Sequence, residues 1–274
     1  MKSMKPVELF LTLSLAVSLG ACGTSVPDNG GEGGGNAATT EAVEQNSANH
    51  GGEGGEGGEG GEGASSSNPD EDYATTLSLM LGHLMVAEEL IAVGEYEQAE
   101  PHIGHPVEEL YGAIESQLGD RGVADFKNVL NSAHDLIKTA PESPELQTQL
   151  DASIEAIDTA LAALGEAELQ SPEFVLGVMN NLLQVAGEEY AAAIANNQIV
   201  EAVEYQDSRG FVFHSEMLYE QIADQLSPET REAIATALAD LKTAWPTVEP
   251  PQTPVKTPQE VLSRIVEIEA ASNS

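Results

Sequence analysis

Apolar residues recur at helical spacing along most of the chain from Tyr73 to the C-terminus, and no stretch there alternates as a half-buried strand would. Glycines and prolines divide this pattern into segments. Ser143-Pro144, Ser171-Pro172 and Ser227-Pro228 each place serine, a common N-cap, before proline, which is favoured at the first helical position. The sequence therefore predicts an all-α fold, a helical bundle of about seven to nine helices.

These glycines, prolines and Ser-Pro pairs give approximate helix bounds and a domain division. Residues 73–248 are predicted to form the bundle, and residues 249–274 a Pro-rich linker with a short last helix. That helix either packs on the bundle or trails from it. The predicted helices lie near Thr76–Val93, Glu95–Ile103, Pro106–Leu118, Val123–Thr139, Pro144–Leu164, Pro172–Ala195, Ile199–Gln225, Pro228–Ala244 and Pro258–Ala271.

Residues 22–72 are rich in glycine and glutamate and contain no lysine or arginine. A Gly-Gly-Glu triplet repeats from Gly51 to Gly63. Such a segment has too few large apolar residues to form a core, so a disordered tether is predicted. A Gly-rich coil of this length spans on the order of 40 Å, and charge repulsion extends it further.

The N-terminus has the features of an export signal in residues 1–21. Lys2 and Lys5 precede a short apolar run, Leu9–Val17, and then small residues. The run is shorter than the roughly 20 residues that span a bilayer. Cys22, which follows, is the only cysteine of the chain, so a disulfide framework and a thiolate metal cluster are excluded.

Leu19-Gly20-Ala21-Cys22 resembles the lipobox of bacterial lipoprotein precursors. The resemblance implies that Cys22 carries diacylglycerol and, after cleavage, a further acyl chain such as palmitate. It implies a protein anchored by lipid to a membrane of the cell envelope, outside the cytoplasm. The resemblance further implies that inner-membrane retention is marked by an aspartate after the lipidated cysteine; Gly23 stands there instead, which favours an outer membrane in a Gram-negative cell. An ordinary cleaved signal ending in Ala-Cys is the alternative. The family of the helical domain is not recognised.

The charge balance is strongly acidic, with 46 acidic residues against 10 lysines and arginines and a formal net charge of -36. Such a field repels nucleic acid and anionic lipid headgroups, and both are excluded as partners. It attracts cations and basic envelope proteins. The alternative interpretation is a solubility adaptation to a salty habitat.

Several ionisable residues fall inside the apolar stripes of the predicted helices, where water would not reach them. If the chain from Glu100 to Gly112 is nearly continuous helix, His102, His105 and Glu109 share one face. Pro106, however, tends to start a new helix and would turn His102 aside. The candidate metal-ligating residues are His102, His105, Glu109, His83, Glu189, Asp207 and His214.

Buried carboxylates are paired, protonated or bound to a cation. Imidazole and carboxylate groups are common ligands for zinc, copper and iron, and helical bundles build such sites from facing helices. Mutually satisfied ion pairs are the alternative, as is a non-covalent haem on His214 or His83. His134 is interpreted as core packing, and Arg209 as the ion-pair partner of Glu204 or Asp207.

No nucleophile elbow, phosphate-binding loop or Cys-x-x-Cys-His haem motif occurs, so nothing in the sequence supports an enzyme. The leading hypothesis is a non-enzymatic, lipid-anchored helical domain that binds a transition-metal cation. The alternative is a structural or protein-interaction lipoprotein without a metal.

Overall fold

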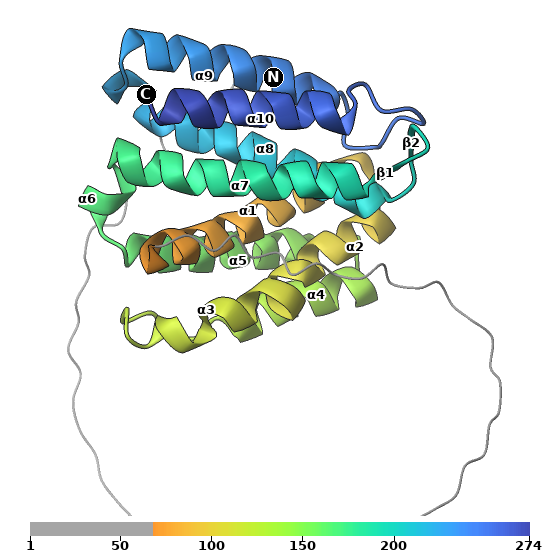
Figure 1. Cartoon of the computed structure of the whole chain (residues 1–274). Helices are drawn as coiled ribbons and strands as arrows, with labels where there is room; N and C mark the ends of the chain where they lie inside the picture. Colours follow the sequence, from red (N-terminus) through yellow and green to blue (C-terminus); the bar gives the residue numbers. More distant parts are fainter. Residues whose placement is uncertain (1–67) are drawn as a thin grey trace, which may run out of the picture. The chain divides into compact units, whose positions relative to one another are not determined.

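A computed structural model describes residues 68–274, and this part of the chain is all-α, as predicted (Figure 1). The predicted signal peptide, Cys22 and nearly all of the predicted tether lie outside the described residues. The first described helix, α1 (Pro69–Val93), begins earlier than the predicted start near Thr76, inside the range assigned to the tether. The reason is local: the Asn68 side chain accepts a hydrogen bond from the Asp70 amide at 3.1 Å, and Pro69 occupies the first turn.

Helix α1 lies at the centre of the fold. It contacts α2 (Tyr96–His105), α5 (Pro144–Ala162), α7 (Pro172–Ala192) and α8 (Ala202–Ile222). It is the one described helix long and apolar enough to cross a membrane by length and composition. Most of its side chains are buried against these four helices, however, which is also what the central helix of a globular bundle requires.

On one side of α1 lie the helices of the first half of the chain. After α2 the chain continues through a short π-helix, η2 (Pro106–Leu110), into α3 (Tyr111–Leu118) and then α4 (Lys127–Thr139), which packs on α5 (Figure 1). The predicted helix near Pro106–Leu118 is therefore two elements. The Ser143 hydroxyl caps α5 by accepting from the Glu145 amide, as predicted.

On the other side lie α7, α8, α9 (Pro228–Leu241) and α10 (Pro258–Ser272), preceded by the single turn α6 (Glu166–Leu169). Short 3-10 turns, η3 (Ala223–Gln225) and η4 (Lys242–Ala244), follow α8 and α9. Ser227 caps α9 as predicted, but Ser171 makes no side-chain cap bond to α7.

The turn between α7 and α8 differs from the prediction. Asn196 and Asn197 adopt positive φ, 53° and 61°, and form the tip of a minimal hairpin of β1 (Ile194–Ala195) and β2 (Gln198–Ile199). Ile194 pairs with Ile199 in antiparallel register. Asparagine tolerates the left-handed conformation, which explains why this pair can form the tight turn that reverses the chain.

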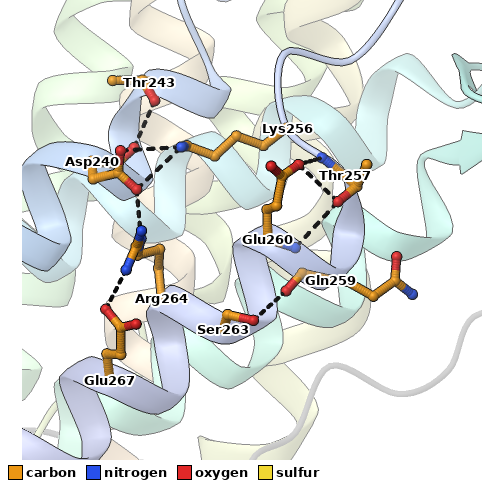
Figure 2. Close-up of polar contacts among 9 residues, drawn as sticks. All are labelled: Asp240, Thr243, Lys256, Thr257, Gln259, Glu260, Ser263, Arg264 and Glu267. Carbon is orange, nitrogen blue, oxygen red and sulfur yellow. Dashed lines mark hydrogen bonds and ion pairs between the residues drawn. The ribbon is translucent and has the colours of Figure 1, made fainter.

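The last helix packs on the bundle rather than trailing from it. Ile265 of α10 lies so close to α7 that a Cβ on Gly187 would be 2.9 Å from its Cδ1. Asp240 of α9 accepts from Arg264 Nε at 2.6 Å and from Lys256 Nζ at 3.1 and 3.2 Å (Figure 2). Thr257 and Glu260 form a capping box at the start of α10. The segment predicted as a linker and separate helix thus completes the group α7–α10.

Candidate metal centre

Three histidines and one aspartate converge between α1, α2 and α8. His83 comes from α1, His102 and His105 from the last turn of α2, and Asp207 from the first half of α8. Each offers one ligand atom, and these atoms all lie within 4.8 Å of one another. His83, His102 and Asp207 are fully buried, and the His105 side chain is 16% exposed. Residues more than a hundred positions apart in the sequence therefore form one compact cluster.

The close crossing of α1 and α8 brings His83 and Asp207 together. A Cβ on Gly82 would lie 2.6 Å from a carbon of the Phe211 ring, and one on Gly210 would lie 2.3 Å from the Gly82 carbonyl oxygen. Only glycine fits at such a contact. His83 directly follows Gly82 on one helix, and Asp207 lies about one turn before Gly210 on the other.

The helix of the two other histidines continues past Pro106 instead of ending there. Proline lacks the amide hydrogen that an α-helix needs, and the chain takes up one extra residue: the Tyr111 amide bonds to the Pro106 carbonyl in the π register. Helix α2 therefore runs unbroken through His105, and His102 and His105, three residues apart, share one helix face. The structure thus brings together the His102–His105 pair that the sequence left conditional on Pro106.

The Asp207 carboxylate lies at the centre of the cluster. Its Oδ1 atom is 2.6 Å from His83 Nδ1 and 2.7 Å from His102 Nδ1, while its Oδ2 is 3.5 Å from His105 Nδ1. Oδ2 and His105 Nδ1 are both buried, and neither has a hydrogen-bond partner among residues 68–274. At this corner of the cluster, two buried polar atoms therefore face each other at ion-pair distance, and neither has a hydrogen bond to a described protein group.

The electrostatics favour an ionised Asp207. Burial alone raises the pKa of its carboxyl, but the charges of His83 and His102, the hydrogen bond from His102 and the nearby His105 ring hold that pKa well below its usual range. For His105, burial lowers the pKa, yet the facing Asp207 carboxylate outweighs burial and raises the pKa overall. The carboxylate thus requires positive charge around it, from protons or from a bound cation.

Three imidazoles and one carboxylate form a nitrogen-and-oxygen donor set without sulfur. Such a set suits first-row divalent cations, among them Fe²⁺, Zn²⁺ and Cu²⁺. The two unsatisfied atoms, His105 Nδ1 and Asp207 Oδ2, fit this purpose because a cation between them would satisfy both. The residues present therefore fit a transition-metal ion.

The other predicted ligands lie at the edge of the cluster or away from it. Glu109 Oε1 is 3.6 Å from His105 Nε2, so Glu109 contacts a cluster histidine from outside. Glu189, half-buried on α7, and His214, buried farther along α8, do not belong to the cluster. Helical spacing predicts which face of a helix is buried, but it does not show which neighbouring helix that face meets.

His214 has an unusual environment of its own. Neither ring nitrogen has a hydrogen-bond partner in the described part of the chain, and burial lowers its pKa to about 4. The ring is therefore neutral at ordinary pH.

Two other expectations are corrected by the structure. His134 does not only pack in the core: its Nε2 lies 2.6 Å from Glu100 Oε1, and its Nδ1 is 3.5 Å from Glu108 Oε1. Arg209 pairs with Glu89 of α1, at 2.8 Å, rather than with Glu204 or Asp207. Both corrections have one cause, since the partners come from facing helices that sequence spacing does not reveal.

Gln206 is a residue of the site that the sequence analysis missed. It is fully buried, and its Oε1 lies 3.0 Å from Nε2 of His102. The signal available was the density of polar residues between Tyr205 and Phe211, which is high for a helix in a core.

Residues 165–274 match the family model described as the iron permease-associated 4-helix bundle domain. The match takes in α6 to α10, and with them Gln206 and Asp207, whereas the three cluster histidines lie before it. No curated protein and no solved structure matches the chain. The cluster thus joins the matched helices to helices that the family model does not cover.

Proposed function

We propose that this protein is a lipid-anchored, extracytoplasmic domain that binds one transition-metal cation among His83, His102, His105 and Asp207. The observation that carries the proposal is the pair of buried atoms, His105 Nδ1 and Asp207 Oδ2, which face each other at 3.5 Å without hydrogen-bond partners in residues 68–274. A cation coordinated there would give both atoms a bonding partner and would balance the negative charge of the buried carboxylate.

Iron is the cation we favour, with zinc and copper as competitors. The family matched by residues 165–274 is described as iron permease-associated, and the donor set is one that iron accepts. The net charge of -36 supports the proposal, because an acidic surface raises the local concentration of cations. His105 is the most exposed of the four residues, so we propose that the cation enters beside His105 and Glu109.

The attachment to a membrane is part of the same proposal. The lipobox-like sequence ending at Cys22 supports a lipid anchor, and the match of residues 165–274 to an iron permease-associated family model supports a place at a membrane. A domain held there would keep its cation close to membrane-bound partners. A protein-interaction module without a metal is the competing function, in which the four cluster residues only pair with one another.

Metal analysis after demetallation tests the proposal. The purified protein is reloaded with Fe²⁺ without oxygen, and separately with Zn²⁺ and Cu²⁺, and the bound metal is counted. We expect one equivalent in the wild type, and an affinity at least about 100-fold lower in Asp207→Asn and His105→Gln. Glu189→Gln and His214→Gln are matched controls and should bind as the wild type does. No stoichiometric binding, or equal binding by all four variants, would overturn the proposal.

A further inference from the structure

Gln206 connects the cluster to two other parts of the fold. Its side-chain nitrogen donates to Gln98 Oε1 of α2 at 2.9 Å and to the Val248 carbonyl, in the segment after η4, at 3.3 Å. Its side-chain oxygen faces His102 Nε2 at 3.0 Å. Every polar atom of this buried amide is therefore engaged.

The orientation of the Gln206 amide is set by groups that can only accept. The Val248 carbonyl has no proton to give, so the Gln206 atom beside it is the NH₂ group. Gln98 is fixed in the same way, because its own NH₂ group donates to the Glu95 carboxylate at 3.0 Å. With both amides fixed, the Gln206 oxygen faces His102 and accepts a hydrogen bond from it.

This arrangement determines which nitrogen of His102 carries the proton. Since Gln206 Oε1 only accepts, Nε2 of His102 must be its N–H side. A neutral imidazole has one N–H, so its lone pair is then on Nδ1. Nδ1 lies 2.7 Å from Asp207 Oδ1, a distance that two lone pairs hold only with a proton or a cation between them.

We propose that Gln206 is a positioning residue that keeps His102 in the Nε2–H tautomer and presents its Nδ1 to the cation. This inference rests on the proposed function. The other ring nitrogen of a metal-bound histidine is commonly held by a hydrogen bond that fixes the tautomer and ring orientation, and the amide of Gln206 supplies that hydrogen bond. Because Gln98 and Val248 hold Gln206, the ligand orientation depends on the packing of α2 and of the segment after η4 against α8.

Two substitutions of Gln206 separate positioning from simple packing. Gln206→Leu removes the acceptor for His102. Gln206→Glu keeps an acceptor there but sets its second oxygen against the Val248 carbonyl and Gln98 Oε1, so it should lower the melting temperature while preserving the tautomer. Asn181→Leu is the matched control, because it removes a half-buried amide between α7 and α1 that contacts Thr75 and no cluster residue.

The test is zinc affinity together with ¹⁵N NMR of the histidine rings in the zinc-loaded full chain. In the wild type we expect His102 to show a protonated Nε2 and a zinc-bound Nδ1. Gln206→Leu should keep one zinc, bind it about 10–100-fold more weakly and lose the protected Nε2–H signal, whereas Asn181→Leu should change only the melting temperature. Wild-type affinity in Gln206→Leu, or zinc on Nε2 of His102, would overturn the inference and leave the metal site standing. A wild type that takes up no zinc, iron or copper would instead overturn the proposed function, and this role of Gln206 with it.

Discussion

Gly210 of α8 lies directly against the backbone of Gly82 of α1, so that a Cβ built on Gly210 would be 2.3 Å from the Gly82 carbonyl oxygen. The neighbour of one glycine, His83, and a residue one turn from the other, Asp207, lie 2.6 Å apart at their nearest atoms. The closeness of the helices at this point thus sets the separation of two candidate ligands.

Gly210→Ala should separate the two helices. An added methyl group against backbone has no flexible neighbour to displace, and overpacking of this kind typically costs about 1–3 kcal/mol. We expect this loss in urea unfolding, together with weaker metal binding because His83 and Asp207 move apart.

The matched control for this substitution is Gly112→Ala in α3, which has nothing within 4 Å of its added Cβ. An exposed helical glycine gains roughly 0.5–1 kcal/mol on replacement by alanine. A Gly210→Ala protein as stable as the wild type would contradict the proposed role of this contact.

Removal of the metal should lower the melting temperature of the wild type. A ligand bound only to the folded state stabilises it by about 2.7 kcal/mol at a hundredfold excess over Kd. We expect a chelator to abolish this gain in calorimetry, and Asp207→Asn to show no difference with or without chelator. A chelator effect of equal size in Asp207→Asn would place the metal elsewhere.

The fold class was predictable from the sequence because helical periodicity and Ser-Pro starts are local signals. The Ser143 and Ser227 caps are confirmed where they were predicted. The start of α1 at Pro69 was missed, although Asn68-Pro69 is the same kind of signal, because the acidic residues that follow it resemble the tether. Helix ends depend on such competition between neighbouring signals.

The candidate site was predictable only in part. Periodicity identifies which face of a helix is buried, and it picked out His83, His102, His105 and Asp207. It does not say which faces meet. Glu189 and His214 show the same pattern but do not belong to the cluster. The cluster forms where α1 and α8 cross at Gly82 and Gly210, and helical spacing within one segment does not reveal such a contact between distant segments. Gln206 lies in the dense polar stretch between Tyr205 and Phe211, but it was missed because an uncharged amide does not stand out as part of a metal site until its partners are known.

Arg209→Met should cost more stability than Glu89→Gln, although the two residues form one ion pair. The Arg209 guanidinium pairs with Glu89, donates to the Trp245 carbonyl at 2.8 Å and lies over the Phe213 ring, with 4.1 Å between its Cζ and the ring centroid. Its removal leaves a buried carbonyl without this donor, which costs about 1–3 kcal/mol. Glu89 is 37% exposed, so its loss should cost about 1 kcal/mol or less. Equal losses in urea unfolding would show that the ion pair alone matters.

Cys22→Ser should abolish lipid attachment and the cleavage that accompanies it. Two or three acyl chains hold a protein stably on a membrane, whereas a single chain holds it only marginally. Labelling cells with a clickable fatty acid should mark the wild type and leave the variant unmarked, as an uncleaved precursor or soluble material. Label on the Cys22→Ser protein, or a wild type that fractionates as freely soluble, would refute the anchor.

His214 should make the metal-free protein less stable as the pH falls from about 6.5 to about 4. Its pKa is about 4 in the folded state, against 6.5 for an unperturbed histidine, so between these values the unfolded chain binds the extra proton and the folded chain does not. The difference of pKa corresponds to about 3 kcal/mol, lost progressively over this interval and fully lost below pH 4. His214→Leu removes this titrating group and should flatten the pH dependence of the free energy of unfolding by that amount. The comparison is made by urea unfolding of both proteins with chelator present, so that the metal centre contributes no metal release. Parallel pH profiles for the two proteins would show that the His214 ring is hydrated or paired in solution.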